Sequence, residues 1–192
     1  MSHSGYGRLM TTDREQVLES AAALLTRKAT ATMDEVARAA GISRATLHRL
    51  FAGRDTLVRA IEDMSLRRFE EALDAARLDE DEASDALRRL VAEAEPVAGV
   101  LAFLITENQL FEAEGMNEGW DRIDDRVSAL FRRGQESGEF RIDLTPAWLT
   151  DALYGLISSG AWSVQDGRLA AKDFQYMIVE LLLGGARRSV KR

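Results

Sequence analysis

Four arginines and no acidic side chain lie in the stretch from Val36 to Arg54. The arginines are Arg38, Arg44, Arg49 and Arg54. A guanidinium group stays charged at neutral pH, and its planar fork of N–H donors matches phosphate oxygens and the O6 and N7 acceptors of guanine. Such a cluster is suited to binding a polyanion.

Two short helices must present these arginines. The apolar spacing within Val36–Ala40 predicts one helix face, and Gly41 can adopt the positive φ that ends a helix. Ser43 then predicts the start of a second helix, because its hydroxyl can accept a backbone N–H two or three residues later. A helix, a short turn and a second helix form the helix-turn-helix layout, in which the second helix enters the DNA major groove.

The second helix has an inward and an outward face. Leu47, Leu50 and Phe51 follow helical spacing and are expected in the core, so the basic side chains point outward. We expect Arg44, in the first turn, to contact bases and Arg54 to contact phosphate. The candidate DNA-binding residues are Thr32, Ser43, Arg44, Ala45, Thr46, His48, Arg49 and Arg54.

The run AGISRATLHRLFAGRDTL resembles the signature of the TetR family of bacterial transcription regulators. The resemblance covers about residues 13–60, and a weaker one continues in GQESGEFRID at 134–143. His48 stands where the family usually has tyrosine and Arg54 where it has lysine, and a glycine common near Arg27 and Lys28 is missing. The resemblance implies a homodimer with an effector pocket in a helical body, acting most often as a repressor.

The apolar patterns predict an all-α protein with an N-terminal three-helix domain that contains the helix-turn-helix, and a larger helical domain. Thr12 or Asp13 is expected to cap the first helix, whose apolar stripe consists of Leu18, Ala21, Ala22 and Leu25. In the larger domain the run 97–105 is expected to be central, and two helices are predicted by the stripes Ala83, Ala86, Leu87, Leu90, Val91, Ala94 and Trp120, Ile123, Val127, Leu130, Phe131. We expect a mobile arm at 1–11, a DNA-binding domain at 12–57 and a ligand-binding and dimerisation domain at 58–192.

Residues 1–60 contain nine Lys/Arg against six Asp/Glu, whereas the remainder contains 16 against 26, within a net charge of −7. The N-terminal part, here called the head, is therefore positive and would be oriented toward DNA by the field of the phosphates. The remaining helical part, here called the body, is acidic.

The helical body supplies candidates for a dimer interface. A long helix from Asp55 is expected to connect the head to this body, and its last two helices carry more apolar surface than one small body needs. Pairing with a second copy would cover this surface, whereas a purely intramolecular core is the alternative. The candidate interface residues are Leu153, Ile157, Gly160, Phe174, Ile178, Leu181 and Leu182, with Val179 and Leu183 beside the stripe and Gly155 allowing close approach.

Aromatic side chains with polar neighbours suggest a pocket for an apolar or aromatic small molecule, although aromatic residues at helical spacing are also common in a plain core. The candidate ligand-binding residues are Phe103, Glu107, Asn108, Phe111, Trp120, Tyr154 and Trp162.

Other chemistry has little support in the sequence. The chain has no cysteine and two histidines, so we expect no metal site, and no motif indicates a cofactor or an enzyme. The longest apolar run, 97–105, is too short to span a bilayer, and we expect a cytoplasmic protein. Two functions stay open: a ligand-responsive DNA-binding regulator, or a helical small-molecule-binding protein whose helix-turn-helix is scaffold or contacts another protein.

Overall fold

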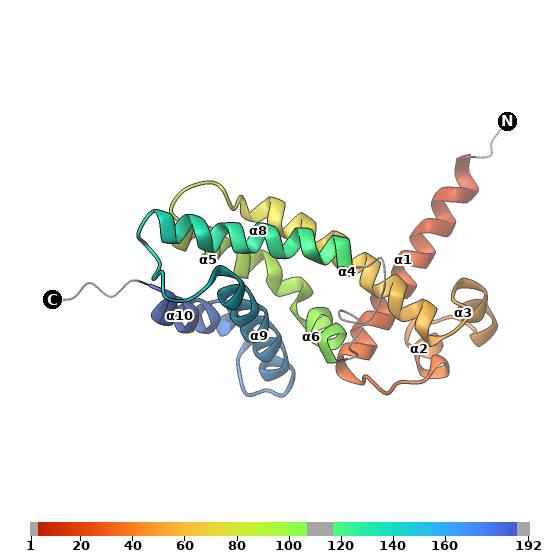
Figure 1. Cartoon of the computed structure of the whole chain (residues 1–192). Helices are drawn as coiled ribbons and strands as arrows, with labels where there is room; N and C mark the ends of the chain where they lie inside the picture. Colours follow the sequence, from red (N-terminus) through yellow and green to blue (C-terminus); the bar gives the residue numbers. More distant parts are fainter. Residues whose placement is uncertain (1–3, 107–116, 188–192) are drawn as a thin grey trace. The chain divides into compact units, whose positions relative to one another are not determined.

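The computed structural model describes residues 4–106 and 117–187, and every regular element in these ranges is a helix (Figure 1). This confirms the all-α prediction. The described chain divides into two compact units, Met1–Ser65 and Leu66–Arg192. No helix among the described residues is long and apolar enough to cross a membrane.

Unit 1 contains three helices and the beginning of a fourth: α1 (Ser4–Arg27), α2 (Met33–Ala39), α3 (Arg44–Leu50) and the first turns of α4 (Arg54–Ala76) (Figure 1). Helix α2 packs against both α1 and α3. The core of this unit is apolar and includes the predicted stripe of α1; its buried residues include Leu18, Ala21, Ala22, Leu25, Val36, Leu47, Phe51, Leu57 and Ile61. The predicted three-helix head is therefore present.

The N-terminal segment differs from the expected arm. Helix α1 begins at Ser4, so residues 4–11, which we expected to be a mobile arm, are helical. We expected a start at Thr12 or Asp13 because these residues are good caps. Once a helix has formed, each further residue adds a hydrogen bond at little cost, so capping side chains need not mark its first turn.

The boundary between the units also differs from the expected one. It follows Ser65, in the middle of α4, whereas we expected the division after Leu57. Leu57 and Ile61 are buried within unit 1, and Phe69 and Leu73 are buried within unit 2. One continuous helix therefore contributes apolar side chains to both cores, which is why the change of unit leaves no break in its sequence pattern.

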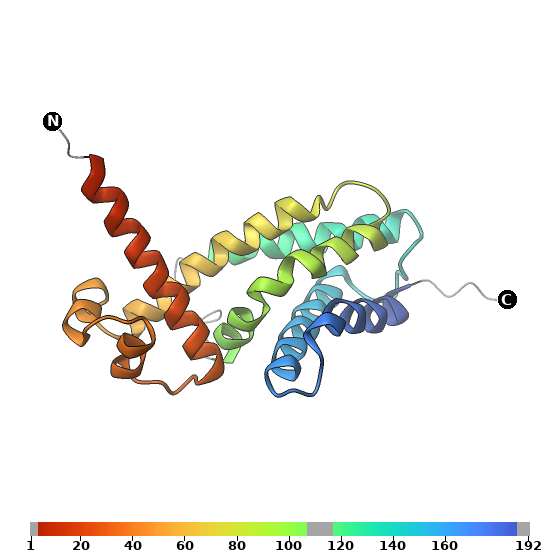
Figure 2. The same cartoon turned by 180° about the vertical axis from the view of Figure 1, so that it is seen from behind.

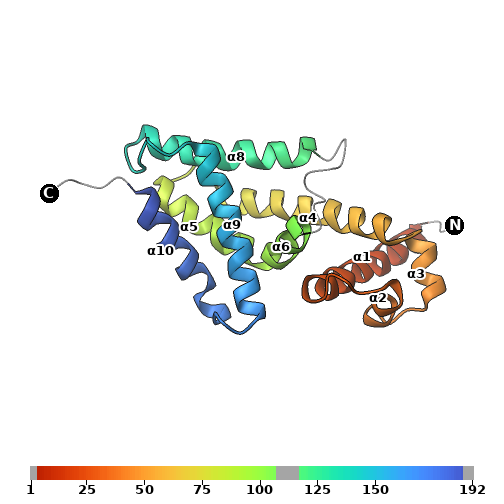
Figure 3. The same ribbon diagram turned by 60° about the horizontal axis from the view of Figure 1, so that its bottom comes forward.

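Unit 2 contains the rest of α4 and the helices that follow it (Figure 2). These are α5 (Ala83–Ala94), the 3₁₀ turn η1 (Glu95–Val97), α6 (Ala98–Thr106), α8 (Asn117–Glu136), α9 (Pro146–Gln165), the 3₁₀ turn η2 (Ala171–Asp173) and α10 (Phe174–Ala186). Helix α9 packs against α6, α8 and α10, and α5 packs against α8 and α10 (Figure 3). Helix α9 is therefore the central element of this unit.

The core of unit 2 follows the predicted helical stripes. The apolar positions expected on α5 are all buried, as are those expected on α8: Trp120, Ile123, Val127, Leu130 and Phe131. Most of the apolar run 97–105 is also buried, as expected for a central segment. Pro96 separates α5 from α6 within the 3₁₀ turn, because proline cannot donate the hydrogen bond that would continue α5.

The connection from α8 to α9 is held by specific contacts. The Glu139 carboxylate accepts hydrogen bonds from the backbone N–H groups of Ala83 and Ser84, at 2.8 and 3.0 Å, and so caps α5. These bonds hold the Glu139 pKa below its ordinary value although partial burial acts in the opposite direction. Gly134 lets the Phe140 ring approach closely, since a Cβ there would lie 2.3 Å from a ring carbon.

Candidate nucleic-acid interface

The turn between α2 and α3 has the geometry that the sequence predicts. Gly41 has φ +67°, in the left-handed region that glycine tolerates best. Ser43 is the N-cap of α3, and its hydroxyl accepts a hydrogen bond from the backbone N–H of Thr46 at 3.1 Å. The orientation of α3 is therefore set by a four-residue turn and one capping side chain.

Helix α3 exposes the side chains that were expected to face outward. Arg44, Ala45, His48 and Arg49 are exposed, whereas Leu47 is fully buried. Of the other two residues expected in the core, Phe51 is buried, whereas Leu50 is only half-buried. Among the candidate DNA-binding residues, Thr32 and Ser43 are exposed and Thr46 is half-buried. The exposed face of α3 is thus positive and carries no acidic residue.

Helix α2 is fixed at its start by a complete capping box. Thr32 accepts a hydrogen bond from the Glu35 backbone N–H, and the Glu35 carboxylate accepts one from the Thr32 backbone N–H at 2.8 Å. The Lys28 ammonium group donates a hydrogen bond to Glu35 at 2.6 Å. The bonds from Lys28 and then from Thr32 lower the pKa of Glu35 to about 2.

Arg54 has a different environment from the one expected for a phosphate contact. Its guanidinium nitrogens donate hydrogen bonds to the backbone carbonyl oxygens of Ala29 at 2.6 Å and Ala31 at 3.1 Å. These carbonyls belong to the α1–α2 turn, where the glycine common in similar sequences is missing. Arg54 therefore stabilises this turn, and its half-buried side chain is directed into the unit.

Arg44 has a partner that the sequence pattern does not indicate, Asp34. Its Nε lies 3.1 Å from Asp34 Oδ1, and its Nη1 donates to Asp34 Oδ2 at 3.4 Å. Both side chains are exposed. The two residues are ten positions apart and on different helices, so no helical spacing indicates the pair; only the α2–α3 turn brings them together.

Comparisons with known proteins identify the family. The sequence model described as "Bacterial regulatory proteins, tetR family" matches residues 17–61, which include α2, α3 and the turn between them. The chain is 31% identical over 174 residues to the HTH-type transcriptional regulator NfxB of Pseudomonas aeruginosa, a match that covers 90% of this chain and 93% of NfxB. The chain belongs to the TetR family of bacterial transcription regulators.

Two further proteins are similar over most of their length. The HTH-type transcriptional repressor LfrR of Mycolicibacterium smegmatis is 25% identical over 158 residues, which are 80% of each protein. Its crystal structure in complex with proflavine has a TM-score of 0.79 and 21% identity, covering 94% of this chain and 99% of LfrR. AibR, solved with isovaleryl coenzyme A and operator DNA, has a TM-score of 0.71 and 19% identity, covering 90% and 99%.

This TetR-family chain is a DNA-binding transcription regulator, and α3 is the second helix of its helix-turn-helix motif. The alternative in which the helix-turn-helix is only scaffold is not favoured, because the family match is centred on that motif. Among the described residues, no group of His, Cys, Asp and Glu side chains is arranged to hold a metal ion.

The candidate ligand-binding residues lie in different environments. Phe103 on α6 and Trp120 on α8 are buried, and the Trp120 ring packs edge-on against Phe69 at 5.8 Å. Tyr154 donates a hydrogen bond to Asp124 at 2.8 Å, and Trp162 is 41% exposed. Burial and then the carboxylate raise the pKa of Tyr154, while burial raises the pKa of Asp124. Glu107, Asn108 and Phe111 lie outside the described residues.

Most of the residues expected at a dimer interface belong instead to the core of the regulator's own unit 2. Six of the seven are buried within the chain: Leu153, Ile157, Gly160, Phe174, Ile178 and Leu182. Gly160 does permit a close approach, but the approaching groups are Phe174 and Ile178 of the same chain, 2.9 and 3.0 Å from the position of a Cβ. Only Leu181 remains on the surface.

The two residues expected beside the apolar stripe of α10 are also buried. Val179 and Leu183 are almost inaccessible because α10 contacts both α9 and α5, and two adjacent faces of the helix are therefore covered. The exposed large apolar side chains of α10 are Tyr176, Met177 and Leu181. The exposed apolar face of α10 is therefore a different face from the one that we expected at a dimer interface.

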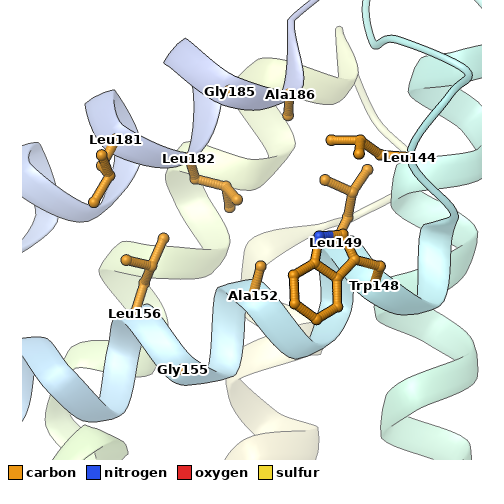
Figure 4. A pocket seen from close by; sticks show the side chains of 10 residues that line it. All are labelled: Leu144, Trp148, Leu149, Ala152, Gly155, Leu156, Leu181, Leu182, Gly185 and Ala186. Carbon is orange, nitrogen blue, oxygen red and sulfur yellow. The ribbon is translucent and has the colours of Figure 1, made fainter.

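A shallow apolar groove of about 350 Å³ runs between α9 and α10 (Figure 4). Leu181 and Gly185 line it from α10, while Trp148 and Gly155 line it from α9. Its other lining residues are Leu144, Leu149, Ala152, Leu156, Leu182 and Ala186. The groove shares no residue with the candidate ligand-binding set.

Proposed function

We propose that this regulator is a repressor that binds an approximately palindromic operator as a homodimer and is released by a small-molecule effector bound in unit 2. The observation that carries the DNA-binding part is the exposed, acid-free face of α3, held by the Ser43 cap. The proposals of an effector and of a homodimer rest on the helices of unit 2 and on the resemblance to the TetR family, which implies an effector pocket and a dimer.

We assign base contact to Arg44, in the first turn of α3, because recognition helices usually contact base edges with their N-terminal residues. Ser43, Ala45, Thr46, His48 and Arg49 complete the proposed contact face, and Thr32 adds a contact from the start of α2. Arg54 is withdrawn from this face, because its guanidinium group is bonded to the α1–α2 turn.

A second copy of the chain is proposed to cover the groove between α9 and α10. Two of the apolar side chains that line this groove, Trp148 and Leu181, are exposed on the single chain and would be covered by the partner. Gly155 would let the backbone of the partner approach closely, because nothing lies within 4 Å of the position of its Cβ. Two copies related by a two-fold axis would place two α3 helices on half-sites about 34–36 Å apart, or a multiple of that distance.

The effector is proposed to be an apolar or aromatic molecule bound among the helices of unit 2. Two buried polar atoms, Trp120 Nε1 and Ser158 Oγ, have no hydrogen-bond partner among the described residues. A polar group on the ligand could satisfy such atoms. The crystal structures of LfrR with proflavine and of AibR with isovaleryl coenzyme A and operator DNA support a ligand and DNA for this chain as well.

The DNA part is tested by selection from a random duplex pool, followed by footprinting on the selected sequence. Enrichment of a palindrome with two protected half-sites is expected, and Arg44→Ala should lose about 1–3 kcal/mol on that sequence and relax preference at one base position. A chain that enriches no sequence would support the alternative, a small-molecule-binding protein. Since the chromosome is its target, we place the protein in the cytoplasm.

The effector part is tested with proflavine as the first probe. If it acts allosterically, the factor by which it weakens DNA binding must equal the factor by which the selected DNA weakens proflavine binding; both follow from one coupling free energy, typically ~1–3 kcal/mol. Tryptophan fluorescence gives proflavine affinity with and without DNA. Equal affinities in the two titrations would exclude proflavine as an effector, while leaving the DNA-binding proposal intact.

A further inference from the structure

The carboxylate of Asp34, on α2, reaches across the turn to the guanidinium group of Arg44, on α3. Two contacts join them, Nε to Oδ1 at 3.1 Å and Nη1 to Oδ2 at 3.4 Å. We propose that Asp34 is a positioning residue that holds Arg44 in the orientation in which it reads a base. This inference rests on the proposed base contact by Arg44.

The neighbouring acid shows why Asp34 is available for this role. Glu35 is engaged in the capping box with Thr32 and in the bond to Lys28, so the start of α2 is already secured by it. Asp34 takes part in neither interaction, and its carboxylate contacts Arg44 instead. The Asp34 side chain is thus directed at α3, the proposed recognition helix.

The geometry leaves part of the arginine fork available to DNA. A guanidinium group has five N–H donors in one plane, and Asp34 engages Nε and Nη1, so Nη2 can still donate to a base. An unrestrained arginine loses considerable rotamer freedom when it is fixed on a base edge. The carboxylate removes part of that freedom before DNA arrives, and its bonds strengthen as the interface excludes water.

The charge of Asp34 has the opposite effect on DNA in general. An exposed carboxylate beside the interface repels phosphates, so it disfavours every duplex to a similar extent. Asp34 favours binding only to a duplex in which Arg44 contacts the correct base. The predicted role is therefore selectivity: Asp34 lowers affinity for random DNA and raises the preference for the correct sequence over it.

The experiment uses the full chain and two duplexes, one selected from a random pool by the native protein and one with the same bases scrambled. Affinity for each is measured for the native chain and for the variants Asp34→Ala, Asp34→Glu, Arg44→Ala and the double variant Asp34→Ala with Arg44→Ala. Asp63→Ala is the matched control, because it removes the same charge from an exposed position on α4. Thermal melting by circular dichroism checks that each variant is folded.

In Asp34→Ala, the ratio of selected-site to random affinity should fall about 2- to 5-fold, the range expected of an exposed ion pair, while random-DNA affinity stays equal or rises. Asp34→Glu should restore most of the ratio, since its carboxylate can reach Arg44. In the Arg44→Ala background, removing Asp34 should leave the ratio unchanged. Asp63→Ala should change both affinities together.

Two results would overturn the inference while the proposed DNA-binding function stands. One is an Asp34→Ala variant with the native ratio; the other is a fall in the ratio that persists in the Arg44→Ala background, which would indicate an effect through α2 itself. A native chain that selects no sequence from the pool would instead overturn the proposed function, and the inference with it.

Discussion

At the scale of the residue, the charged side chain of Arg54 donates hydrogen bonds to two backbone carbonyl groups that are 23 and 25 positions away in the sequence. Arg54→Ala removes both bonds and is expected to lower the free energy of unfolding by about 1–3 kcal/mol, because bonds from charged donors are stronger than neutral ones. Urea unfolding measures this change. DNA affinity should fall only as far as the α1–α2 turn loses its conformation.

The control is Arg59→Ala, which removes the same charge from an exposed position on α4. It should leave the free energy of unfolding within about 0.5 kcal/mol of the native value. If the two variants unfold at the same urea concentration while Arg54→Ala alone weakens binding to all DNA, then Arg54 contacts phosphate after all.

Glu35 makes the stability of the head depend on pH. Its pKa is lowered from 4.5 to about 2 in the folded chain, so its carboxylate favours folding at pH values above 4.5 and this contribution is lost as the pH falls from 4.5 toward 2. The stability difference between the native chain and Glu35→Gln should therefore be full at pH 7 and vanish near pH 2.

Urea unfolding at a series of pH values measures this difference, and Glu15→Gln, an exposed acid on α1, is the control. Subtracting the variant from the native chain removes the titration of all other acids. A stability difference that is as large at pH 3 as at pH 7 would mean that the negative charge of Glu35 does not stabilise the folded chain.

At the scale of the element, α9 and α10 form a close intramolecular pair. Gly160→Ala adds a methyl group 2.9 Å from the Phe174 ring and 3.0 Å from Ile178, and overpacking of this kind costs about 1–3 kcal/mol. Alanine recovers about 0.5–1 kcal/mol through its higher helix propensity, so the net effect should be a modest loss of stability.

Gly184→Ala is the matched substitution on α10, where nothing lies within 4 Å of the position of a Cβ. It should stabilise the chain by about 0.5–1 kcal/mol through helix propensity alone. Chemical unfolding of both variants at one protein concentration tests the pair. Equal stabilisation by the two substitutions would show that α9 and α10 are not packed at Gly160.

At the scale of the whole molecule, the affinity for DNA is expected to depend on the proposed dimerisation through unit 2. Leu181 is 66% exposed, so Leu181→Glu should leave the fold of one chain intact. In the proposed dimer the same charge would lie in an apolar interface, where burial without a partner is strongly unfavourable. We expect a monomer with weakened affinity for a palindromic duplex, measured by light scattering and by gel shift.

Ala129→Glu is the control, because it adds the same charge at an exposed position on α8. It should leave both the oligomeric state and DNA affinity unchanged. Ile178→Glu would be a poor test, since Ile178 is buried in the core and its replacement would unfold the chain. A monomeric Leu181→Glu variant with full affinity would contradict the proposed dimer.

The sequence by itself determined the local features of this protein. The Gly41 turn, the Ser43 cap and the outward face of α3 were predicted, because each depends on residues within one or two helical turns. The apolar stripes of α5 and α8 were predicted for the same reason: helical periodicity is a short-range property that each segment carries by itself.

Tertiary structure alone decided which partners these segments meet. Arg54 reaches a turn more than twenty residues away, and Arg44 meets Asp34 only because the α2–α3 turn has one particular geometry. Helix α10 carries apolar residues on several sides, so its sequence pattern is compatible with more than one inward face. Contact with both α5 and α9 buries Val179 and Leu183 and leaves Leu181 outside, because the face that a helix buries is selected by the helices packed around it.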